Sequence, residues 1–257
     1  MDARDPSVPD RLAALLLTAR RAVILAGQRL GHPERVEASA RGEWARRASL
    51  ENLLTRPADF WDYYEPLAQD IARRQPEPVH TAIARLQQAD IVSALITQGV
   101  DRLHVRAGSP DAVEVYGTAL VARCERCGER YGLPEVSVLR RESADGVPRC
   151  SAEGCGYPLR PTGTLWNEPL PAAAVRRAWE LAGETDCFVV LDSELRTAPL
   201  ALLPSVPLRR GAPLVVIGEA PTRYDRYAAL LARGPSPPAM IALADLLAPA
   251  QEARAGG

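Results

Sequence analysis

Short apolar runs recur along the chain with helical segments between them, and this alternation restricts the fold more than any other feature. The runs cover residues 22–26, 91–97, 187–191 and 214–217. Their length and near-continuous hydrophobicity are typical of strands buried on both faces of a parallel sheet. Helical patterns occupy residues 11–20, 80–88 and 171–181. The alternation predicts an α/β fold with a Rossmann-like, doubly wound parallel sheet, whose ligands bind beyond the carboxyl ends of the strands.

Two stretches interrupt this alternation. Residues 34–75 are helix-rich and too long for a plain loop between a strand and a helix. Residues 123–158 contain four of the five cysteines and have little apolar periodicity. We therefore predict a small helical module in the first stretch and a stapled module in the second. We interpret the aromatic residues of the first stretch as core packing; they are Trp44, Phe60, Trp61, Tyr63 and Tyr64.

Composition excludes some classes of partner and environment. The formal net charge is -1, so no general attraction to nucleic acid or anionic lipid is expected. No apolar run approaches the roughly 18 residues that a membrane span needs, and no signal-peptide pattern begins the chain. We therefore expect a cytoplasmic protein with no membrane partner. Five cysteines without an export signal favour metal ligation over disulfides.

Four cysteines have the spacing of a zinc ribbon. Cys124 and Cys127 form one pair, and Cys150 and Cys155 form a second pair after 22 intervening residues. This pattern predicts a tetrahedral site for structural Zn²⁺, because four sulfur ligands leave no open position for water or substrate. A degenerate site or free thiols remain the alternative. Cys187 lies inside an apolar run, and we interpret it as an inert core residue.

These features divide the chain into one domain, residues 11–232, and a Pro- and Ala-rich tail, residues 233–257. Within the domain we assign residues 11–30, 86–119 and 159–232 to the Rossmann-like core, residues 31–85 to the helical insert, and residues 120–158 to the zinc ribbon.

Several motifs together resemble the sirtuin family. Residues 96–109 read ITQGVDRLHVRAGS, which is similar to the family's Thr-Gln-Asn-Ile-Asp-x-Leu-His-x-x-Ala-Gly-Ser. Shorter matches follow the family order at residues 75–80, 113–117, 159–161, 166–171 and 193–199. The resemblance extends from about residue 23 to residue 225. It implies the sirtuin fold, which combines a Rossmann-like sheet, a helical module and a zinc ribbon, and it implies a relation to NAD-dependent protein deacylases.

The resemblance also implies a set of site residues. In sirtuins the acyl-lysine oxygen attacks the ribose carbon of NAD and releases nicotinamide, and a histidine then takes a proton from a ribose hydroxyl. Tyr116 occupies the position of that histidine and is the candidate catalytic residue. Asp101 matches the residue that holds the nicotinamide carboxamide. The candidate cofactor-binding residues are Gly27, Gln28, Gln98, Asp101 and Ser193.

The motifs depart from the family pattern at the catalytic position and beside it. A phenol with a pKa near 10 is ionised in only about one molecule in a thousand at neutral pH. Losing a general base typically costs about 10²- to 10⁴-fold in rate. Gly99 also replaces an asparagine that helps position cofactor and water in the family. Tyr116 alternatively serves only as a packing residue at the floor of a former site.

Further departures affect the expected nucleotide site. The first glycine-rich turn carries Gln28 and Arg29 where small residues let backbone amides approach phosphates. Asp192 and Glu194 place carboxylates where the family binds an anionic cofactor, and Gly218 replaces an asparagine near the adenosine ribose. The family's loop over the nicotinamide has no counterpart between residues 32 and 44. We therefore expect NAD to bind weakly, if at all.

The leading functional prediction is a sirtuin-type zinc-binding domain with little or no deacylase activity. Such a domain acts by binding a partner protein, an acyl-lysine peptide in the cleft between the sheet and the zinc module, or a nucleotide. The alternative is an active NAD-dependent protein deacylase or ADP-ribosyltransferase, in which a nearby arginine or a water relay activates Tyr116. A sensor that binds NAD without turnover is a third hypothesis.

Overall fold

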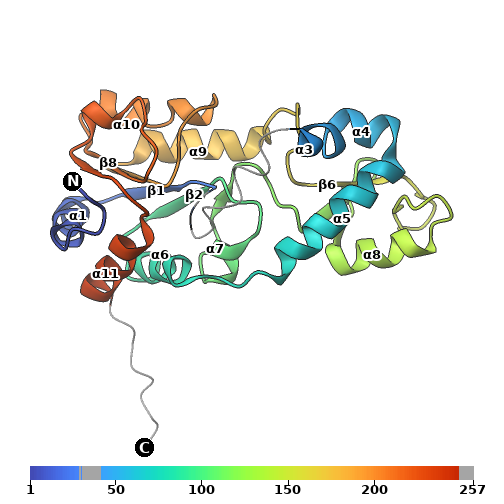
Figure 1. The fold of residues 1–257 in the computed structure, drawn as a ribbon, viewed down its shortest axis with the longest axis horizontal. Coiled ribbons are helices and arrows are strands. Elements are labelled where there is room, and N and C mark those ends of the chain that lie inside the picture. Colours follow the sequence, from blue (N-terminus) through green and yellow to red (C-terminus); the bar gives the residue numbers. More distant parts are fainter. Residues whose placement is uncertain (29, 31–41, 249–257) are drawn as a thin grey trace, which may run out of the picture.

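Six short parallel strands form the main sheet of the computed structural model, which describes residues 1–28, 30 and 42–248 (Figure 1). The strands are β1 (Ala22–Ala26), β2 (Ala94–Thr97), β3 (Val113–Glu114), β7 (Cys187–Leu191), β8 (Leu214–Ile217) and β9 (Leu230–Ala232). Their spatial order is β3-β2-β1-β7-β8-β9. The four apolar runs form β1, β2, β7 and β8, which confirms the predicted Rossmann-like fold. The sequence analysis missed β3 and β9, which have only two and three residues.

The strand order places a topological switch point at the centre of the sheet. After β1 the chain adds β2 and β3 on one side, and it later returns to add β7, β8 and β9 on the other side. The strand order reverses at β1, and ligands of such sheets bind at this point, outside the carboxyl ends of the strands. Ala26 lies opposite both Thr97 and Leu191 in the register.

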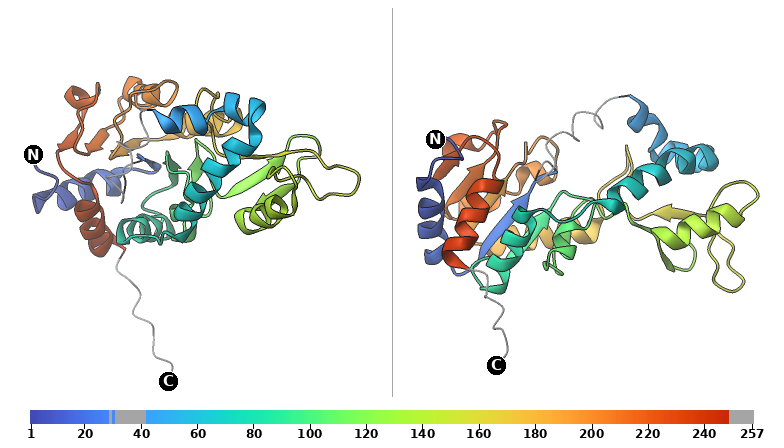
Figure 2. Two further views of the ribbon diagram at one scale, coloured as in Figure 1. Left: turned by 45° about the vertical axis from the view of Figure 1, so that its right-hand side comes forward. Right: turned by 60° about the horizontal axis from the view of Figure 1, so that its bottom comes forward.

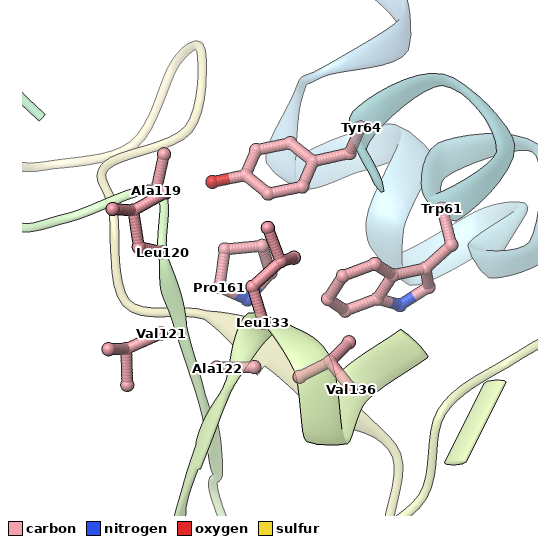
Figure 3. Close-up of a pocket in the computed structure, with 9 residues that line it drawn as sticks. All are labelled: Trp61, Tyr64, Ala119, Leu120, Val121, Ala122, Leu133, Val136 and Pro161. Carbon is pink, nitrogen blue, oxygen red and sulfur yellow. The ribbon is translucent and has the colours of Figure 1, made fainter. Parts of the chain in front are cut away.

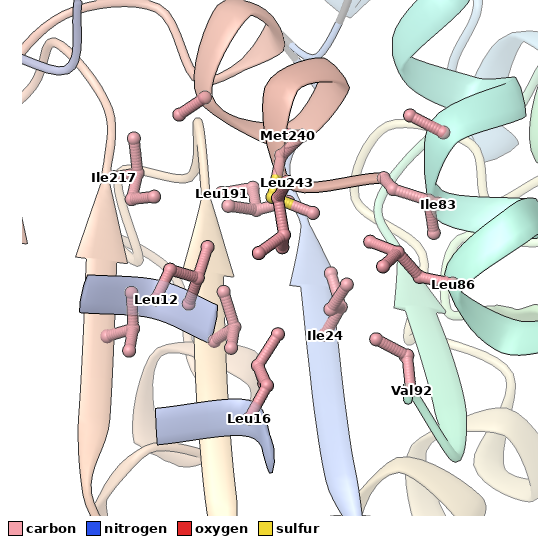
Figure 4. Packing of buried hydrophobic residues seen from close by; sticks show 14 of the residues in the cluster. Leu12, Leu16, Ile24, Ile83, Leu86, Val92, Leu191, Ile217, Met240 and Leu243 are labelled. Atoms are coloured by element: carbon pink, nitrogen blue, oxygen red, sulfur yellow. The ribbon is translucent and has the colours of Figure 1, made fainter. Parts of the chain in front are cut away.

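Helices cover both faces of the sheet. One face carries α1 (Ser7–Thr18), α6 (Pro78–Gln88) and α11 (Pro237–Leu247), and the other carries α9 (Ala172–Glu184) and α10 (Ser205–Arg209). Figure 4 shows Leu12, Ile83 and Met240, one from each helix of the first face, in the apolar cluster that covers the sheet. All three side chains are fully buried.

Two of the predicted domain boundaries separate residues that pack together in the core of the sheet. The division at residue 85 cuts through α6, whose Ile83 and Leu86 belong to the same apolar cluster as β1. The assigned tail after residue 232 contains α11, and its Met240 and Leu243 are fully buried in that cluster. Proline at the first helical positions begins α11, so the proline-rich stretch starts a core helix.

The helical module and the zinc-ribbon module share one apolar core at the other end of the molecule (Figure 2). The helical module comprises α3 (Glu43–Arg47), α4 (Leu50–Thr55) and α5 (Pro57–Arg73). The other module has the antiparallel sheet β5-β4-β6, formed by β4 (Val121–Cys124), β5 (Arg130–Gly132) and β6 (Leu159–Pro161), and helix α8 (Leu133–Glu142). Phe60, Trp61 and Tyr64 are buried in the shared core, which confirms their predicted packing role.

A small cavity lies in this shared core, between α5 and the antiparallel sheet (Figure 3). Trp61 and Tyr64 border it from α5, and Ala122 and Pro161 border it from β4 and β6. The indole Nε1 of Trp61 is buried without a hydrogen-bond partner among the described residues. A polar link adds to the apolar contact, because Glu65 on α5 accepts hydrogen bonds from Ser137 and Arg140 on α8.

Two buried histidines from neighbouring helices pack together. The ring centroids of His80 on α6 and His104 on α7 (Leu103–Arg106) are 4.7 Å apart, and the Nδ1 atom of His104 has no hydrogen-bond partner in the described part of the chain. Burial, with a smaller contribution from the nearby His80, lowers the pKa of His104 to about 3. His104 is therefore neutral in the folded protein at physiological pH.

This histidine should make folding stability depend on pH. Its folded pKa is depressed below the unfolded value of about 6.5, so its stabilising contribution is complete above that value and is lost as the pH falls. Between pH 7 and pH 5 the expected loss is about 2 kcal/mol. Denaturant unfolding of the wild type and a His104→Leu variant at both pH values measures it. An equal pH dependence in the two proteins would contradict the assignment.

None of the helices in the described ranges is long and apolar enough to span a membrane.

Candidate functional site

The four ribbon cysteines converge at the tip of the small antiparallel sheet. Cys124 ends β4, and all four sulfur atoms lie within 4.8 Å of one another. The Sγ separations are 3.5 Å for Cys124–Cys155, 3.5 Å for Cys127–Cys150 and 3.8 Å for Cys127–Cys155. Four sulfurs about 2.3 Å from a central Zn²⁺ would be about 3.8 Å apart in a tetrahedron. The cluster can hold one metal ion, and its donor set suits zinc.

Tyr131, which the sequence analysis did not single out, supports the cluster. Its hydroxyl lies 3.1 Å from the Sγ atom of Cys150 and accepts a hydrogen bond from the backbone N–H of Ser151. Groups that contact metal ligands in this way orient them. The fifth cysteine, Cys187, is fully buried in β7, and burial raises the pKa of its thiol to about 12. This agrees with its interpretation as an inert core residue.

Gly27, Gln98 and Ser193 meet at the carboxyl ends of β1, β2 and β7. The backbone N–H of Gly27 donates to Leu191 O at 2.7 Å, and a Cβ atom on Gly27 would lie 2.0 Å from Asp192 O. Only glycine fits this approach of the two strand ends. The Ser193 hydroxyl donates to Gln98 Oε1 at 2.8 Å, so three of the candidate cofactor-binding residues lie together.

The loop after β2 carries Asp101 and is held by several hydrogen bonds. Thr97 Oγ1 accepts from Gly99 N at 3.0 Å, and Asp101 Oδ1 accepts from Leu103 N at 3.1 Å. A Cβ atom on Gly99 would lie 3.2 Å from Thr97 Oγ1 and 3.4 Å from Asp101 Oδ1. Both neighbours are side-chain atoms, so a larger residue at position 99 needs only small shifts of its neighbours.

Tyr116 lies in a tight turn beside this loop. The turn closes through a hydrogen bond from Gly117 N to Glu114 O, and Tyr116 O accepts from Thr164 N at 2.7 Å. The ring is partly buried and packs against the apolar cluster on the α9 face. Burial raises the pKa of the Tyr116 phenol, so the hydroxyl holds its proton at neutral pH.

The segment after β6 connects this turn to the small modules. Trp166 N donates to Ala48 O, and Leu50 N donates to Trp166 O. Asn167 has φ = 62°, a conformation that glycine and asparagine adopt most readily. Asn167 belongs to the segment 166–171, one of the shorter matches to the family. The neighbouring Glu168 forms a two-pronged ion pair with Arg160, with N–O distances of 2.6 and 2.7 Å.

The two carboxylates after β7 have partners among the described residues. Asp192 Oδ2 accepts hydrogen bonds from the hydroxyl and the backbone N–H of Ser236, at 2.6 and 3.2 Å. Glu194 forms an ion pair with Arg196 at 2.5 Å. Arg196 therefore offsets the charge of Glu194, whereas Asp192 is held by hydrogen bonds from an uncharged residue and keeps its negative charge.

The turn after β1 is described only in part. Gln28 is exposed, whereas Leu30 is buried in the core of the sheet. Arg29 and most of the segment between residues 32 and 44 lie outside the described residues. The predicted obstruction by Gln28 and Arg29 and the missing nicotinamide loop therefore stay predictions.

Two charged residues near Asp101 were not predicted from the sequence. Arg102 has φ = 59°, and its Nε atom is buried without a hydrogen-bond partner among the described residues. Glu114, at the end of β3, is partly buried. Burial raises its pKa to about 7, although Arg102 and Arg130 act in the opposite direction. Neither residue type nor spacing signals this environment, which forms only when the loop after β2 folds against β3.

Comparisons with known proteins agree with this arrangement. The sequence model of the Sir2 family matches residues 39–199. The chain is 33% identical over 210 residues to NAD-dependent protein deacetylase 1 of Pyrobaculum aerophilum, covering 80% of this chain and 81% of that protein. It is 37% identical over 190 residues to the NAD-dependent protein deacylase of Methylococcus capsulatus, covering 73% of each.

Solved structures of Sir2 proteins are also similar to this chain. Sir2Tm bound to a propionylated peptide has a TM-score of 0.77 and 26% identity, covering 92% of this chain and 95% of that one. A second structure is of a Sir2 mutant with a histidine replaced by tyrosine, together with a p53 peptide and NAD. It has a TM-score of 0.77 and 28% identity, covering 93% of this chain and 96% of that one.

Proposed function

Because this chain belongs to the Sir2 family, we propose that it binds NAD and an acyl-lysine peptide but removes the acyl group slowly, if at all. The observation that carries the proposal is the partly buried Tyr116, which occupies the position of the family's proton-accepting histidine. The relatives named above are called NAD-dependent deacetylases or deacylases. These names support NAD binding by this chain.

Support for NAD binding comes from the strand ends. Gly27 keeps the close approach of β1 and β7, Ser193 and Gln98 are hydrogen-bonded to each other, and Asp101 is retained. The carboxylates of Asp192 and Glu194 are engaged by Ser236 and Arg196. A Sir2 mutant with tyrosine in place of a histidine was solved with NAD and a peptide, which supports the view that a phenol in such a site tolerates both ligands.

Support for slow chemistry comes from Tyr116 itself. A phenol whose pKa is raised by burial does not accept a proton from a ribose hydroxyl at neutral pH. Gly99 lacks the amide side chain that the family uses beside it. The acyl-lysine peptide would bind between the parallel sheet and the zinc-ribbon module, and solved relatives hold propionylated and acetylated peptides. The four cysteines would hold Zn²⁺ that stabilises the ribbon and takes no part in the reaction.

An active deacylase is the second candidate. It is favoured by the names of the relatives, whose matches extend over most of the chain. In that case Tyr116 would need a cationic neighbour or a water relay to ionise it. Within the described residues, burial raises the Tyr116 pKa, and no hydrogen bond or neighbouring charge adds to this shift or opposes it.

Calorimetric titration with NAD, paired with an assay of nicotinamide release in the presence of an acetylated peptide, tests the proposal. We expect saturable NAD binding, with peptide-dependent turnover at least about 100-fold below that of an active family member. Absence of NAD binding would contradict the first half of the proposal. Turnover at the rate of an active deacylase would contradict the second half.

A further inference from the structure

The segment at residues 162–168, which follows β6, joins the zinc-ribbon module to the turn that carries Tyr116. Thr164 N donates to Tyr116 O at 2.7 Å. The two backbones also approach closely at the next residue of the turn, because a Cβ atom on Gly117 would lie 2.4 Å from Thr162 O. Only glycine permits this approach, so the position of the segment and the position of Tyr116 are coupled.

This segment borders the path that an acyl-lysine side chain would take to Tyr116. It connects the zinc-ribbon module to the parallel sheet, and the peptide is proposed to bind between these two parts. Trp166 is 42% exposed and Asn167 is also exposed, so the segment presents side chains to a ligand. The conformation of the segment should therefore affect the affinity for the peptide.

Two hydrogen bonds close a turn within the segment. Glu168 Oε2 accepts from Leu165 N at 3.0 Å, and Leu165 O accepts from Glu168 N at 3.1 Å. The turn is also tied to the helical module, because Trp166 N donates to Ala48 O and Leu50 N donates to Trp166 O. The carboxylate of Glu168 is thus the one side-chain group among these contacts that holds the turn.

Arg160 on β6 holds this carboxylate. The two N–O distances are 2.6 and 2.7 Å, and the side chains of Arg160 and Glu168 are only 15% and 16% exposed. Burial would raise the pKa of Glu168, but hydrogen bonds from Arg160 and Leu165 N and the charge of Arg160 lower it below its usual value. A two-pronged pair of this kind is stronger and more directional than an exposed ion pair. Arg160 Nε also donates to Pro161 O at 3.0 Å, which fixes the guanidinium on β6.

We propose that Arg160 is a positioning residue for the acyl-lysine peptide, which acts through Glu168 to hold residues 162–168 in the conformation that binds the peptide beside Tyr116. This inference rests on the proposed peptide binding. Without the guanidinium, the carboxylate is free to leave the turn, and the fraction of molecules ready to bind the peptide falls. Loss of a charge-assisted hydrogen bond lowers such a fraction by about tenfold or more.

Calorimetric titration of the full chain with a peptide centred on acetyl-lysine, and separately with NAD, tests this role without requiring turnover. Arg160→Met removes the guanidinium and keeps an aliphatic stem, and Glu168→Met removes the carboxylate. Each variant should weaken peptide binding by about tenfold. The double variant should bind the peptide no more weakly than Glu168→Met alone, because Arg160 acts through Glu168. NAD affinity should stay at the wild-type value, because the contacts among Gly27, Gln98 and Ser193 do not involve this pair.

Arg140→Met is the matched control. The Arg140 side chain is 17% exposed and pairs with Glu65, which is 10% exposed, so this change also breaks a largely buried ion pair of the zinc-ribbon module. The pair lies at the contact of α5 with α8, and peptide affinity should match the wild type. An equal loss in Arg140→Met would contradict the assignment. Arg160→Lys should recover part of the lost affinity, because an ammonium group still pairs with Glu168 through a single contact.

The remaining outcomes separate the inference from the proposed function. If both single variants bind the peptide like the wild type, if their losses add in the double variant, or if NAD affinity falls together with peptide affinity, the inference is wrong and the proposed function stands. If the wild type binds no acetylated peptide, or binds the acetylated and the unacetylated peptide equally, the proposed peptide binding fails and the inference fails with it.

Discussion

Removal of metal from the four-cysteine cluster is expected to unfold the zinc-ribbon module. Four thiolates within 4.8 Å of one another repel strongly unless protons or a cation separate them. The binding free energy of a structural zinc site is on the order of 10 kcal/mol, comparable with the whole stability of a domain. Elemental analysis should find about one zinc per chain. Chelation should remove it and eliminate the cooperative thermal transition of the ribbon.

Two cysteine variants separate ligation from the general cost of altering a buried thiol. Cys150→Ser, at a buried ligand position, should lower the zinc content toward zero and reproduce the effect of chelation. Cys187→Ala, which is equally buried but in β7, should keep the zinc content at about one per chain and lose stability only through its cavity. Metal-free protein that unfolds like the untreated protein would show that the cluster does not stabilise the fold.

Replacing Tyr116 by histidine is expected to raise peptide-dependent nicotinamide release and deacylation by about 10²- to 10⁴-fold. An imidazole has an ordinary pKa near 6.5 and can accept a proton at neutral pH, whereas burial raises the pKa of the existing phenol. The ring is smaller than the phenol and fits the partly buried position. Chromatographic assay of nicotinamide and deacylated peptide measures both products.

The double variant Tyr116→His/Gly99→Asn should be faster still, because position 99 meets only movable side-chain atoms at 3.2 and 3.4 Å. Tyr227→His makes the same exchange at an exposed position and should leave the rate at the wild-type level. If the single and the double variant both remain inactive while NAD binds, the missing base is not the cause of slow turnover. The turn after β1 would then be the next candidate.

The parts of the fold that follow from local pattern were predictable from the sequence. β1, β7 and β8 are continuous apolar runs, and such runs have few stable solutions other than burial in a parallel sheet. The cysteine spacing predicted a cluster for a similar reason, since two closely spaced pairs form two metal-binding turns. In contrast, α11 follows a proline-rich stretch that also fits a linker, and only its packing on α1 and α6 distinguishes the two.

The electrostatics of the candidate site could not be predicted in this way. The partner of Asp192 is Ser236, 44 positions away in the sequence, so the carboxylate looked unpaired until the fold brought α11 beside β7. Glu114 could not be singled out for a related reason, because nothing in its sequence neighbours indicates that it is partly buried against the loop after β2. Pairing and desolvation both depend on contacts between distant segments, and these decide how a charged residue behaves.

A short segment after β6 connects the small antiparallel sheet to the backbone of Tyr116. β6 pairs with β4, whose last residue is Cys124, and three residues after β6 the N–H of Thr164 donates to the backbone carbonyl of Tyr116. If loss of the metal unfolds the ribbon, β6 should unfold with it, and the hydrogen bond from Thr164 to Tyr116 should break. If the cluster holds Zn²⁺ and the cleft binds NAD as proposed, the supply of zinc would influence the fraction of molecules that can bind the nucleotide, without any contact between the two ligands.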